Sequence, residues 1–528
     1  MPIIVSEIKT PLSTKKEEII SLAIKKAGLK ATDIVSSAIN KTSLDARHND
    51  DIKLVSSVCL SLSSEKLEQK VSERKGVKYY EEKELVIVKG KLHQEGRIVV
   101  VGFGPAGMLA SLVLAENGYR PIVLERGASV DERVSAVENF FKNANLDTSS
   151  NVQFGEGGAG TFSDGKLTTR IGDELCSYVL KRFAEFGAPE EILTKANPHI
   201  GTDKLREVVK NIRNRVIELG GEIRFNTKAE DFIIENDKIK SVVTENDEIK
   251  CSAVIIAIGH SARDTFSKLL EKGVFIEPKP FSVGARIEHK RIEVNKSLYG
   301  KNYDNPLLPE GEYKLSYREG DRGVYTFCMC PGGYVVPSSS EEETVVTNGM
   351  SEFSRDAENS NAAVVVSISP DDFGKNALDG VDFARNIEKN AFVLGGKNYR
   401  APAVSVGNFL DKKVGIENLS VNPSYAIGVE KADFDKLFPP FITDMMRKGL
   451  MKFGNKMQCF KDRGALLTAA ETRTSSPVRI LRTEERTSVS FSNLYPTGEG
   501  AGYAGGIMSA AVDGIKTATT IIKIYSEE

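Results

Sequence analysis

The sequence predicts an α/β protein with three parts: a doubly wound domain, a largely antiparallel α+β domain inserted into it, and a small α+β domain at the N terminus. A buried strand leads into a glycine-rich turn and an apolar helix after Arg97, and a similar turn and helix occupy 494–524. Between them, from about 277 to 487, the pattern changes to scattered strands and turns with one or two helices. The predicted domains are therefore 1–90, 97–275 together with 488–528, and 276–487.

The composition excludes several classes of protein. The 528 residues hold 71 Lys and Arg against 73 Asp and Glu, a formal net charge of −2, which excludes a nucleic-acid binder that relies on a basic surface. Six cysteines are too few for a disulfide scaffold. No apolar run approaches the roughly 18 residues of a membrane helix, and the first residues lack the pattern of a signal peptide. We expect a cytoplasmic protein.

The first 90 residues have the pattern of a separate unit. Thr14 and Glu17 form a predicted capping box, and Ile20, Ile24 and Ala27 follow at helical spacing. The remaining elements are two alternating strands, a charged helix and a last strand, expected at 33–44, 51–62, 64–74 and 85–88. This β-α-β-β-α-β order predicts a ferredoxin-like sandwich.

The same topology serves RNA-recognition modules, which stack bases on aromatic side chains of the sheet. The predicted third strand, 51–62, holds no aromatic residue. A docking or scaffold domain is therefore favoured over RNA binding. The polar stretch 89–95 is expected to be a linker.

The doubly wound domain continues through elements of both kinds. Helices are expected at 174–186 and 205–219, and a strand at 222–225. A meander of short strands at 229–250 precedes a buried strand at 251–259. No fixed-period repeat is present.

The segment after Arg97 carries the strongest functional signal. Gly102, Gly104 and Gly107 form a G-x-G-x-x-G motif between a buried strand and a helix, and Glu125 ends the next strand. In a Rossmann-type domain the first glycine allows the tight turn, the second lets a pyrophosphate approach, and the third lets helix and strand pack. An acidic side chain at the end of the second strand accepts hydrogen bonds from ribose. The motif predicts dinucleotide binding.

Two distant segments indicate which dinucleotide. Residues 253–260 resemble the apolar strand that closes over the dinucleotide in FAD-dependent oxidoreductases, with Ile258 where Thr is commonest. Residues 494–507 resemble their C-terminal Gly-Asp motif, with Glu499 in the acidic place. The order of the motifs is similar to that of the glutathione-reductase superfamily. The resemblance implies FAD, in place of the NAD of a plain Rossmann domain.

Three further motifs, at 151–166, 327–333 and 471–479, resemble those of a bacterial family of FAD-dependent dehydrogenases. The similarity covers essentially the whole chain and implies an FAD-binding Rossmann-type domain with an insertion. It also implies cofactor-binding roles for Gly102, Gly104, Pro105, Ala106 and Gly107 at the pyrophosphate, Glu125, Arg126 and Ala229 at the adenosine end, Gly158, Ala159, Gly160, Thr161, Phe162 and Ser163 at the central part, and Gly498, Glu499, Gly505, Gly506 and Ile507 at the ribityl chain and flavin. Gly259 ends the strand that closes over the dinucleotide.

Weaker candidates have two interpretations each. Cys328 and Cys330 face one side of a regular strand and are either a redox pair or, as we favour, small buried side chains. Residues 473–479, with Arg473 and Arg479, either hold an anionic substrate or form a structural loop. Asp164 and Lys166 have no assigned catalytic role. The five histidines show no metal-ligand spacing, so no metal is expected.

The sequence therefore predicts a flavoenzyme that transfers a hydride or electron pair through non-covalent FAD to or from a small-molecule substrate. Only one dinucleotide motif is present, so NAD(P)H would have to react at the inserted-domain face. A flavoprotein of tRNA modification and a flavin-stabilised binding or assembly protein are the alternatives. No membrane and no nucleic acid is expected as a partner, and the oligomeric state is left open.

Overall fold

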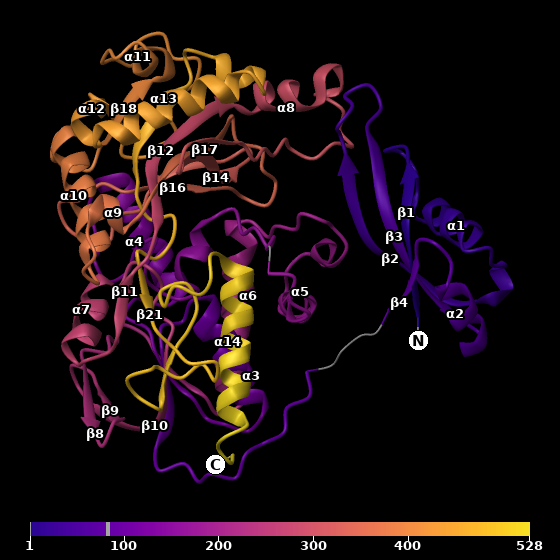
Figure 1. Cartoon of the computed structure of the whole chain (residues 1–528), viewed down its shortest axis with the longest axis horizontal. Coiled ribbons are helices and arrows are strands. Elements are labelled where there is room, and N and C mark those ends of the chain that lie inside the picture. Colours follow the sequence, from indigo (N-terminus) through magenta and orange to yellow (C-terminus); the bar gives the residue numbers. More distant parts are fainter. Residues whose placement is uncertain (1, 81–84, 170, 528) are drawn as a thin grey trace.

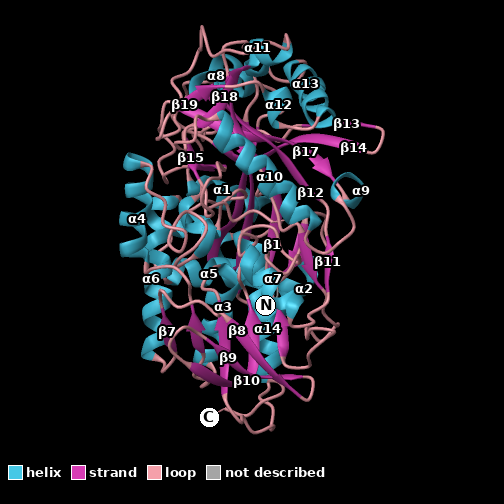
Figure 2. Ribbon diagram, turned by 90° about the vertical axis from the view of Figure 1, so that its left-hand side faces the viewer, coloured by secondary structure: helices cyan, strands magenta, loops and turns pink. Residues whose placement is uncertain are grey.

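The computed structural model describes residues 2–80, 85–169 and 171–527. The chain forms a mixed α/β structure with parallel and antiparallel sheets. The N-terminal unit lies to one side of the remaining chain, and its two helices cover the sheet face that points away from it (Figure 1). In the view of Figure 2, the segment predicted as an insertion lies above the sheet of the doubly wound part.

The N-terminal unit has the predicted β-α-β-β-α-β order, and its sheet runs β2-β3-β1-β4 with antiparallel neighbours. Its elements are β1 (Ile3–Thr10), α1 (Lys16–Lys26), β2 (Ile34–Asp45), β3 (Lys53–Leu62), α2 (Glu65–Ser72) and β4 (Val77–Tyr79). Ile19, Ala23 and Ala27 form the buried face of α1, one residue away from the predicted Ile20 and Ile24.

Two local predictions for this unit are wrong. The capping box does not form, because α1 is capped by Lys15 without a side-chain hydrogen bond. The last strand is β4 at Val77–Tyr79, and residues 85–88 form no strand. Leu85 and Ile87 pack against the core of the doubly wound part, so their alternation reflects burial on another surface.

The doubly wound part is built on a sheet in the order β7-β6-β5-β10-β9-β8, with β22 paired to β10. The strands are β5 (Arg97–Val101), β6 (Ile122–Leu124), β7 (Glu222–Arg224), β8 (Asp231–Glu235), β9 (Lys238–Val243), β10 (Glu248–Ile256) and β22 (Leu494–Pro496). β5, β6, β7, β10 and β22 are parallel neighbours, whereas β8 and β9 form the predicted antiparallel meander.

Alternate residues of β5 belong to two different cores, as expected for a strand buried on both faces. Ile98 and Val100 pack with the helices on one face, and Val99 and Val101 pack with the meander and α7 on the other. The helices of this part are α3 (Pro105–Glu116), α4 (Val130–Asn143), α5 (Leu175–Glu185), α6 (Thr202–Glu218), α7 (Arg263–Glu271) and α14 (Ile507–Ile522). Of these, α4 and α7 were not predicted.

The segment between β11 (Ile276–Pro278) and β21 (Val478–Ile480), which pair with each other, forms a sheet in the order β13-β14-β17-β12-β20-β18-β19. Its strands are β12 (Phe281–Lys290), β13 (Ser316–Glu319), β14 (Arg322–Cys330), β17 (Asn359–Ile368), β18 (Ala401–Ser405), β19 (Val429–Lys431) and β20 (Leu466–Glu471), and β15 (Tyr334–Pro337) pairs with β16 (Thr347–Met350) separately. Apart from the parallel pair β18 and β19, the ladders are antiparallel, as predicted.

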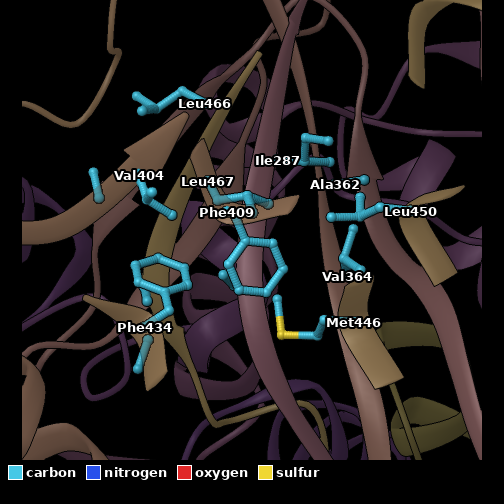
Figure 3. Close-up of a cluster of buried hydrophobic side chains, with 14 of the residues drawn as sticks. Ile287, Ala362, Val364, Val404, Phe409, Phe434, Met446, Leu450, Leu466 and Leu467 are labelled. Carbon is cyan, nitrogen blue, oxygen red and sulfur yellow. The ribbon is translucent and has the colours of Figure 1, made fainter. Parts of the chain in front are cut away.

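The prediction of one or two helices in this segment is wrong. The structure has α8 (Arg291–Tyr299), α9 (Pro370–Phe373), α10 (Asp379–Leu394), α11 (Val406–Leu410), α12 (Phe434–Leu437) and α13 (Pro440–Gly454). Side chains of α13, such as Met446 and Leu450, pack on the sheet beside Ile287 and Val364 (Figure 3). The helices cover a sheet whose strands are separated widely in sequence, so each helix carries a short and interrupted apolar pattern.

Residues 85–96 lie along the end of α14. The Gly90 N–H donates to Ile522, and Leu92 pairs with Tyr525. The predicted linker is thus attached to the C-terminal helix. No helix among the described residues is long and apolar enough to cross a lipid bilayer. The domain boundaries given above stay a prediction.

Candidate functional site

The site forms where the strand order of the parallel sheet reverses. β6 lies on one side of β5 and β10 on the other, and ligands of doubly wound sheets bind in the crevice outside such a pair of strand ends. Gly102 follows β5 with φ 97°, and a Cβ added there would lie 2.5 Å from the Ala257 carbonyl oxygen after β10. The glycine therefore allows the two strand ends to meet below the crevice.

The other two glycines of the motif differ from each other in what surrounds them. A Cβ at Gly107 would lie 2.0 Å from the Gly102 carbonyl oxygen, so this glycine lets α3 pack against the turn. A Cβ at Gly104 would have only the Gly158 Cα within 4 Å, at 3.7 Å. The surroundings agree with the predicted turn and packing roles of Gly102 and Gly107, and they leave the outer side of Gly104 open.

That open side faces a cavity of about 1500 Å³, counting the part that opens to solvent. Sixteen of the twenty predicted cofactor-binding residues line it, from six separate parts of the sequence. They are Gly102, Gly104, Pro105, Ala106, Glu125, Arg126, Gly158, Ala159, Gly160, Ser163, Ala229, Gly259, Glu499, Gly505, Gly506 and Ile507.

Gly107, Thr161, Phe162 and Gly498 do not line the cavity and instead support its wall. The Thr161 hydroxyl donates to the Glu156 carbonyl oxygen at 3.3 Å, and the Phe162 ring lies 4.8 Å from the Arg133 guanidinium. The Gly498 N–H donates to a carboxylate of α14 at 2.7 Å. Sequence motifs include such supporting residues together with the ligand-facing ones.

Glu125 combines a place in the cavity wall with a structural role that the sequence did not reveal. Its carboxylate accepts hydrogen bonds from the backbone N–H groups of Phe103 at 2.8 Å and of Gly127 and Gly155 at 3.0 Å. It therefore joins the glycine-rich turn, the end of β6 and the 153–166 loop. The predicted hydrogen bonds to ribose stay a prediction.

Arg126 and Ala229 lie at the end of the cavity assigned to adenosine. The Arg126 guanidinium lies 4.4 Å from the centre of the Phe154 ring and donates to Asp264 at 2.9 Å and to Thr265 at 2.8 Å. Burial raises and Arg126 lowers the pKa of the Asp264 carboxyl, which is held at about 2. The carboxylate thus fixes Arg126 beside the cavity as a charged pair.

The start of α14 forms the other end. Gly506 caps this helix without a side-chain hydrogen bond, and a Cβ at Gly505 or Gly506 would have no atom within 4 Å. Glu499 lines the same end, and burial, opposed by Lys279, raises the pKa of its carboxyl to about 7. The N-terminus of α3 is likewise uncapped by any side chain, so two helix N-termini point positive dipole ends at one cavity.

The inserted segment supplies a wall that the sequence analysis largely missed. Its lining residues are Phe327, Cys328, Asn348, Glu471, Arg473 and Thr474, and the doubly wound part adds Gln153, Asp164, Lys166 and His260. Of these, only Cys328, Arg473, Thr474, Asp164 and Lys166 were weighed as candidates. Gln153 lies inside the motif at 151–166, and His260 ends the segment 253–260. Their places in these motifs are the sequence signal that could have identified them.

Asp164 and Lys166 belong to an ion-pair network. Asp164 accepts two hydrogen bonds from Arg355, at 2.9 and 2.5 Å, and lies 3.2 Å from the Lys166 ammonium. Glu312 pairs with Lys166 at 3.0 Å and with Arg355 at 2.6 Å. Although burial opposes the shift, Lys166 and Arg355 lower the pKa of Asp164. The network fixes the 158–166 loop against the inserted segment.

Arg473 lies in a second buried network, centred on Glu388 of α10. Glu388 accepts from Arg263 at 2.8 and 2.7 Å, and Arg473 donates to it at 3.2 Å. Thr474 is also occupied, because it exchanges hydrogen bonds with the Ser282 backbone. These contacts favour the structural interpretation of the 473–479 loop over a grip on an anionic substrate.

His260 lies beside this network at the cavity wall. Burial, followed by the Arg473 and Arg263 charges, lowers the pKa of its imidazole to about 3. The ring is therefore neutral near pH 7 and can hold a hydrogen bond toward the cavity.

The prediction that Cys328 and Cys330 lie on a regular strand is wrong. β14 pairs with β17 in even register up to Phe327 and then shifts by one residue, and Cys328 has φ 42°. This β-bulge places the Cys328 side chain at the cavity, whereas Cys330 is fully buried.

The residues present fit a dinucleotide cofactor. Glycines at 104, 259, 505 and 506 leave space that any Cβ would occupy, and two helix N-termini face that space. Among the described residues, no group of three or more His, Cys, Asp or Glu side chains is placed to hold a metal ion. The arrangement thus suits an elongated anion held mainly by backbone groups.

Comparison of the sequence with known proteins identifies its relatives. The family described as "FAD-dependent protein, C-terminal domain-like" matches residues 280–474. An uncharacterized protein from Clostridium beijerinckii is 46% identical over 505 residues, which cover 95% of each chain. The chain belongs to the same family as this relative. Its residues 280–474 match a domain named for FAD-dependent proteins, and FAD is the cofactor.

Two solved structures match much of the chain at low sequence identity. Glycine oxidase from Bacillus cereus is 10% identical, with 81% of this chain and 97% of that chain covered and a TM-score of 0.35. A geranylgeranyl bacteriochlorophyll reductase-like protein from Thermoplasma acidophilum is 13% identical, with 82% and 79% covered and a TM-score of 0.35. The part that defines the family, 280–474, includes the cavity wall from Phe327 to Thr474.

Proposed function

We propose that this member of the family is an FAD-dependent oxidoreductase that passes a hydride or an electron pair between a small-molecule substrate and non-covalently bound FAD. The observation that carries the proposal is the composition of the cavity: backbone glycines form one side, and polar side chains of the inserted segment close the end beside α14. When bound, FAD supplies the exchange of the hydride, and the protein supplies position and electrostatics.

We assign the lining residues to parts of the cofactor as follows. Gly102, Gly104, Pro105 and Ala106 adjoin the pyrophosphate, Glu125, Arg126 and Ala229 the adenosine end, Gly158, Ala159, Gly160 and Ser163 the centre, and Gly259, Glu499, Gly505, Gly506 and Ile507 the ribityl chain and flavin. This assignment places the reactive end against the inserted segment, which holds Cys328 and Asn348. A substrate would enter there.

Two side chains at that end can serve a reaction that moves protons. The pKa of Glu499 is raised to about 7, so its carboxyl oxygen can hold or release a proton near neutral pH. The pKa of His260 is lowered to about 3, so its neutral ring can orient a polar group without adding positive charge. Both roles are consistent with an oxidoreductase.

The proposal includes a cytoplasmic location. All six cysteines are free thiols in the described structure, as is usual for a protein of a reducing compartment.

The deciding experiment is anaerobic stopped-flow mixing of the FAD-loaded protein with NADH, NADPH, a dithiol, and a panel of amino and hydroxy acids. We expect the protein to purify yellow with one FAD per chain. One class of donor should bleach the flavin absorbance within the time recorded after mixing. Oxidised acceptors should then restore the colour. Flavin that no donor bleaches and no acceptor reoxidises would argue against a redox function.

Deleting the N-terminal unit separates catalysis from partner binding. The deletion should stop at residue 80, because Leu85 and Ile87 cover the doubly wound core and Leu92 pairs with Tyr525. Retained flavin turnover in this variant assigns catalysis to residues 81–528. Lost turnover with FAD retained would mean that the N-terminal unit takes part in the reaction.

A further inference from the structure

The bend of β14 beside the cavity is an unusual local structure. The strand pairs regularly from Val324 to Phe327, and the next pair joins Cys330 to Asn361, so one additional residue is accommodated at the bulge. Cys328 takes a left-handed backbone conformation with φ 42°. Such a conformation is unfavourable for a non-glycine residue and is found most often at functional sites. The bend turns one thiol toward the cavity.

The two cysteines lie next to a fixed cation. The Cys330 thiol donates a hydrogen bond to the Cys328 carbonyl oxygen, with 3.5 Å between the sulfur and the oxygen. Arg286 is fully buried, donates to that carbonyl oxygen at 2.8 Å, and is held by two hydrogen bonds to Glu471, at 2.9 and 3.0 Å. The guanidinium therefore stays beside both sulfurs.

These contacts distinguish the two thiols electrostatically. The hydrogen bond from Cys330, together with Arg286 and Lys166, lowers the pKa of Cys328 although burial opposes it. The same hydrogen bond and burial raise the pKa of Cys330. A thiolate beside a protonated thiol is the arrangement from which a disulfide forms and exchanges.

The remaining cysteines of the chain have different surroundings. Burial raises the pKa of Cys251 to about 12 and that of Cys459 to about 11. Among the described cysteines, only Cys328 lines the cavity, and it does so at the end that also holds Glu499.

We propose that Cys328 and Cys330 form a redox-active dithiol–disulfide pair that exchanges an electron pair with FAD. In one direction the Cys328 thiolate and the Cys330 thiol give up two electrons, the Cys330 S–H bond breaks, one S–S bond forms between the two sulfurs, and FAD takes up the two electrons and that proton, giving FADH−. In the reverse direction the reduced flavin returns them and the S–S bond breaks. This proposal rests on the proposed function and names its substrate class, a thiol or disulfide compound that reaches Cys328 from the cavity.

The pair is tested by counting electrons in the FAD-loaded full chain. Air-oxidised protein is titrated anaerobically with dithionite while flavin absorbance is followed, and free thiols are alkylated before and after. We expect wild-type protein to take up four electrons per FAD, and Cys328→Ser or Cys330→Ser to take up two. The matched control is Cys176→Ser, which removes a half-buried thiol of α5 outside the cavity and should keep four.

The wild-type protein alone decides the question if the variants fail to fold. Peptide mapping of its oxidised form without reductant should find the peptide with Cys328 and Cys330 lighter by two hydrogen atoms and unalkylated. FAD-loaded protein that takes up two electrons, with both thiols alkylated after oxidation, overturns this proposal alone. Protein that takes up no FAD overturns the proposed function and this proposal with it.

Discussion

Gly104 and Gly107 offer a matched pair of substitutions that separates cofactor binding from folding. In Gly104→Ala the new Cβ has only one atom within 4 Å, at 3.7 Å, and the backbone has an ordinary φ of −76°. Two effects on stability oppose each other here: Ala restricts the unfolded chain, worth about 0.4–1 kcal/mol, but is a poorer helix N-cap than Gly. The free energy of unfolding of the apoprotein should therefore change by less than about 1 kcal/mol.

Gly107→Ala should behave in the opposite way. Its Cβ would lie 2.0 Å from a backbone carbonyl oxygen, which cannot move aside as a flexible side chain does. Overpacking in a well-packed core costs about 1–3 kcal/mol, and we expect a loss at or above the upper end of that range. Gly104→Ala, by contrast, should weaken FAD binding at least 100-fold, or by about 2.7 kcal/mol, because the methyl group occupies space next to the pyrophosphate.

The two effects are measured by urea unfolding of the apoproteins and by titration with FAD, followed through flavin fluorescence. Unchanged FAD affinity in Gly104→Ala would refute the assignment of the pyrophosphate to this turn. Equal destabilisation of both apoproteins would refute the argument from the surroundings of each Cβ. Gly104→Val should bind FAD still more weakly.

Three other substitutions test the site. Glu125→Ala leaves three buried N–H donors without their acceptor. The free energy of unfolding should fall by about 1–3 kcal/mol for each donor that water does not reach. An unchanged urea midpoint would contradict the structural role of Glu125. The pKa of Glu499 is raised from 4.5 to about 7 in the folded chain, so between these pH values the folded chain binds more protons than the unfolded chain. The free energy of unfolding should therefore fall by up to about 3 kcal/mol as the pH rises from 4.5 to about 7. In apoprotein unfolded by urea at several pH values, Glu499→Gln should lack this component. Glu471→Gln strands the buried Arg286 and should cost about 3–5 kcal/mol, whereas the double variant Arg286→Met/Glu471→Leu should recover most of that loss.

The parts of the site that the sequence predicted well are those set by local structure. Each lies at the carboxyl end of a strand followed by a glycine-rich turn, and β5, β10 and β22 are neighbours in one parallel sheet. Strand ends of neighbouring parallel strands meet at one edge of a sheet, so three motifs far apart in sequence converge without any knowledge of side-chain packing. The resemblance to FAD-dependent proteins supplied the order in which they converge.

Alternation of apolar residues was a less reliable guide. It predicted β2 and β3 within two residues of their ends; every second residue of β3 from Ser56 to Leu62 is buried, whereas β2 has no buried residue. It failed at 85–88, where Leu85 and Ile87 are packed on the doubly wound core while Val86 and Val88 are exposed. A period of two reports which side chains are buried, and it contains no information on whether a partner strand is present.

Local sequence patterns could not predict the side of the cavity that the inserted segment forms, and β14 shows the reason. The rule that residues two apart face the same side holds only while register is kept, and the bulge at Cys328 contains no glycine that would have marked it. One signal was present elsewhere: Arg286 and Glu288 interrupt the otherwise apolar strand β12, and both are fully buried. A charge in a strand of that kind requires a partner and marks a place where stability is given up for specificity or chemistry. The partner of Arg286 is Glu471, 185 residues away, and only the folded chain shows that this pair lies beneath the two thiols and beside the flavin end of the cavity.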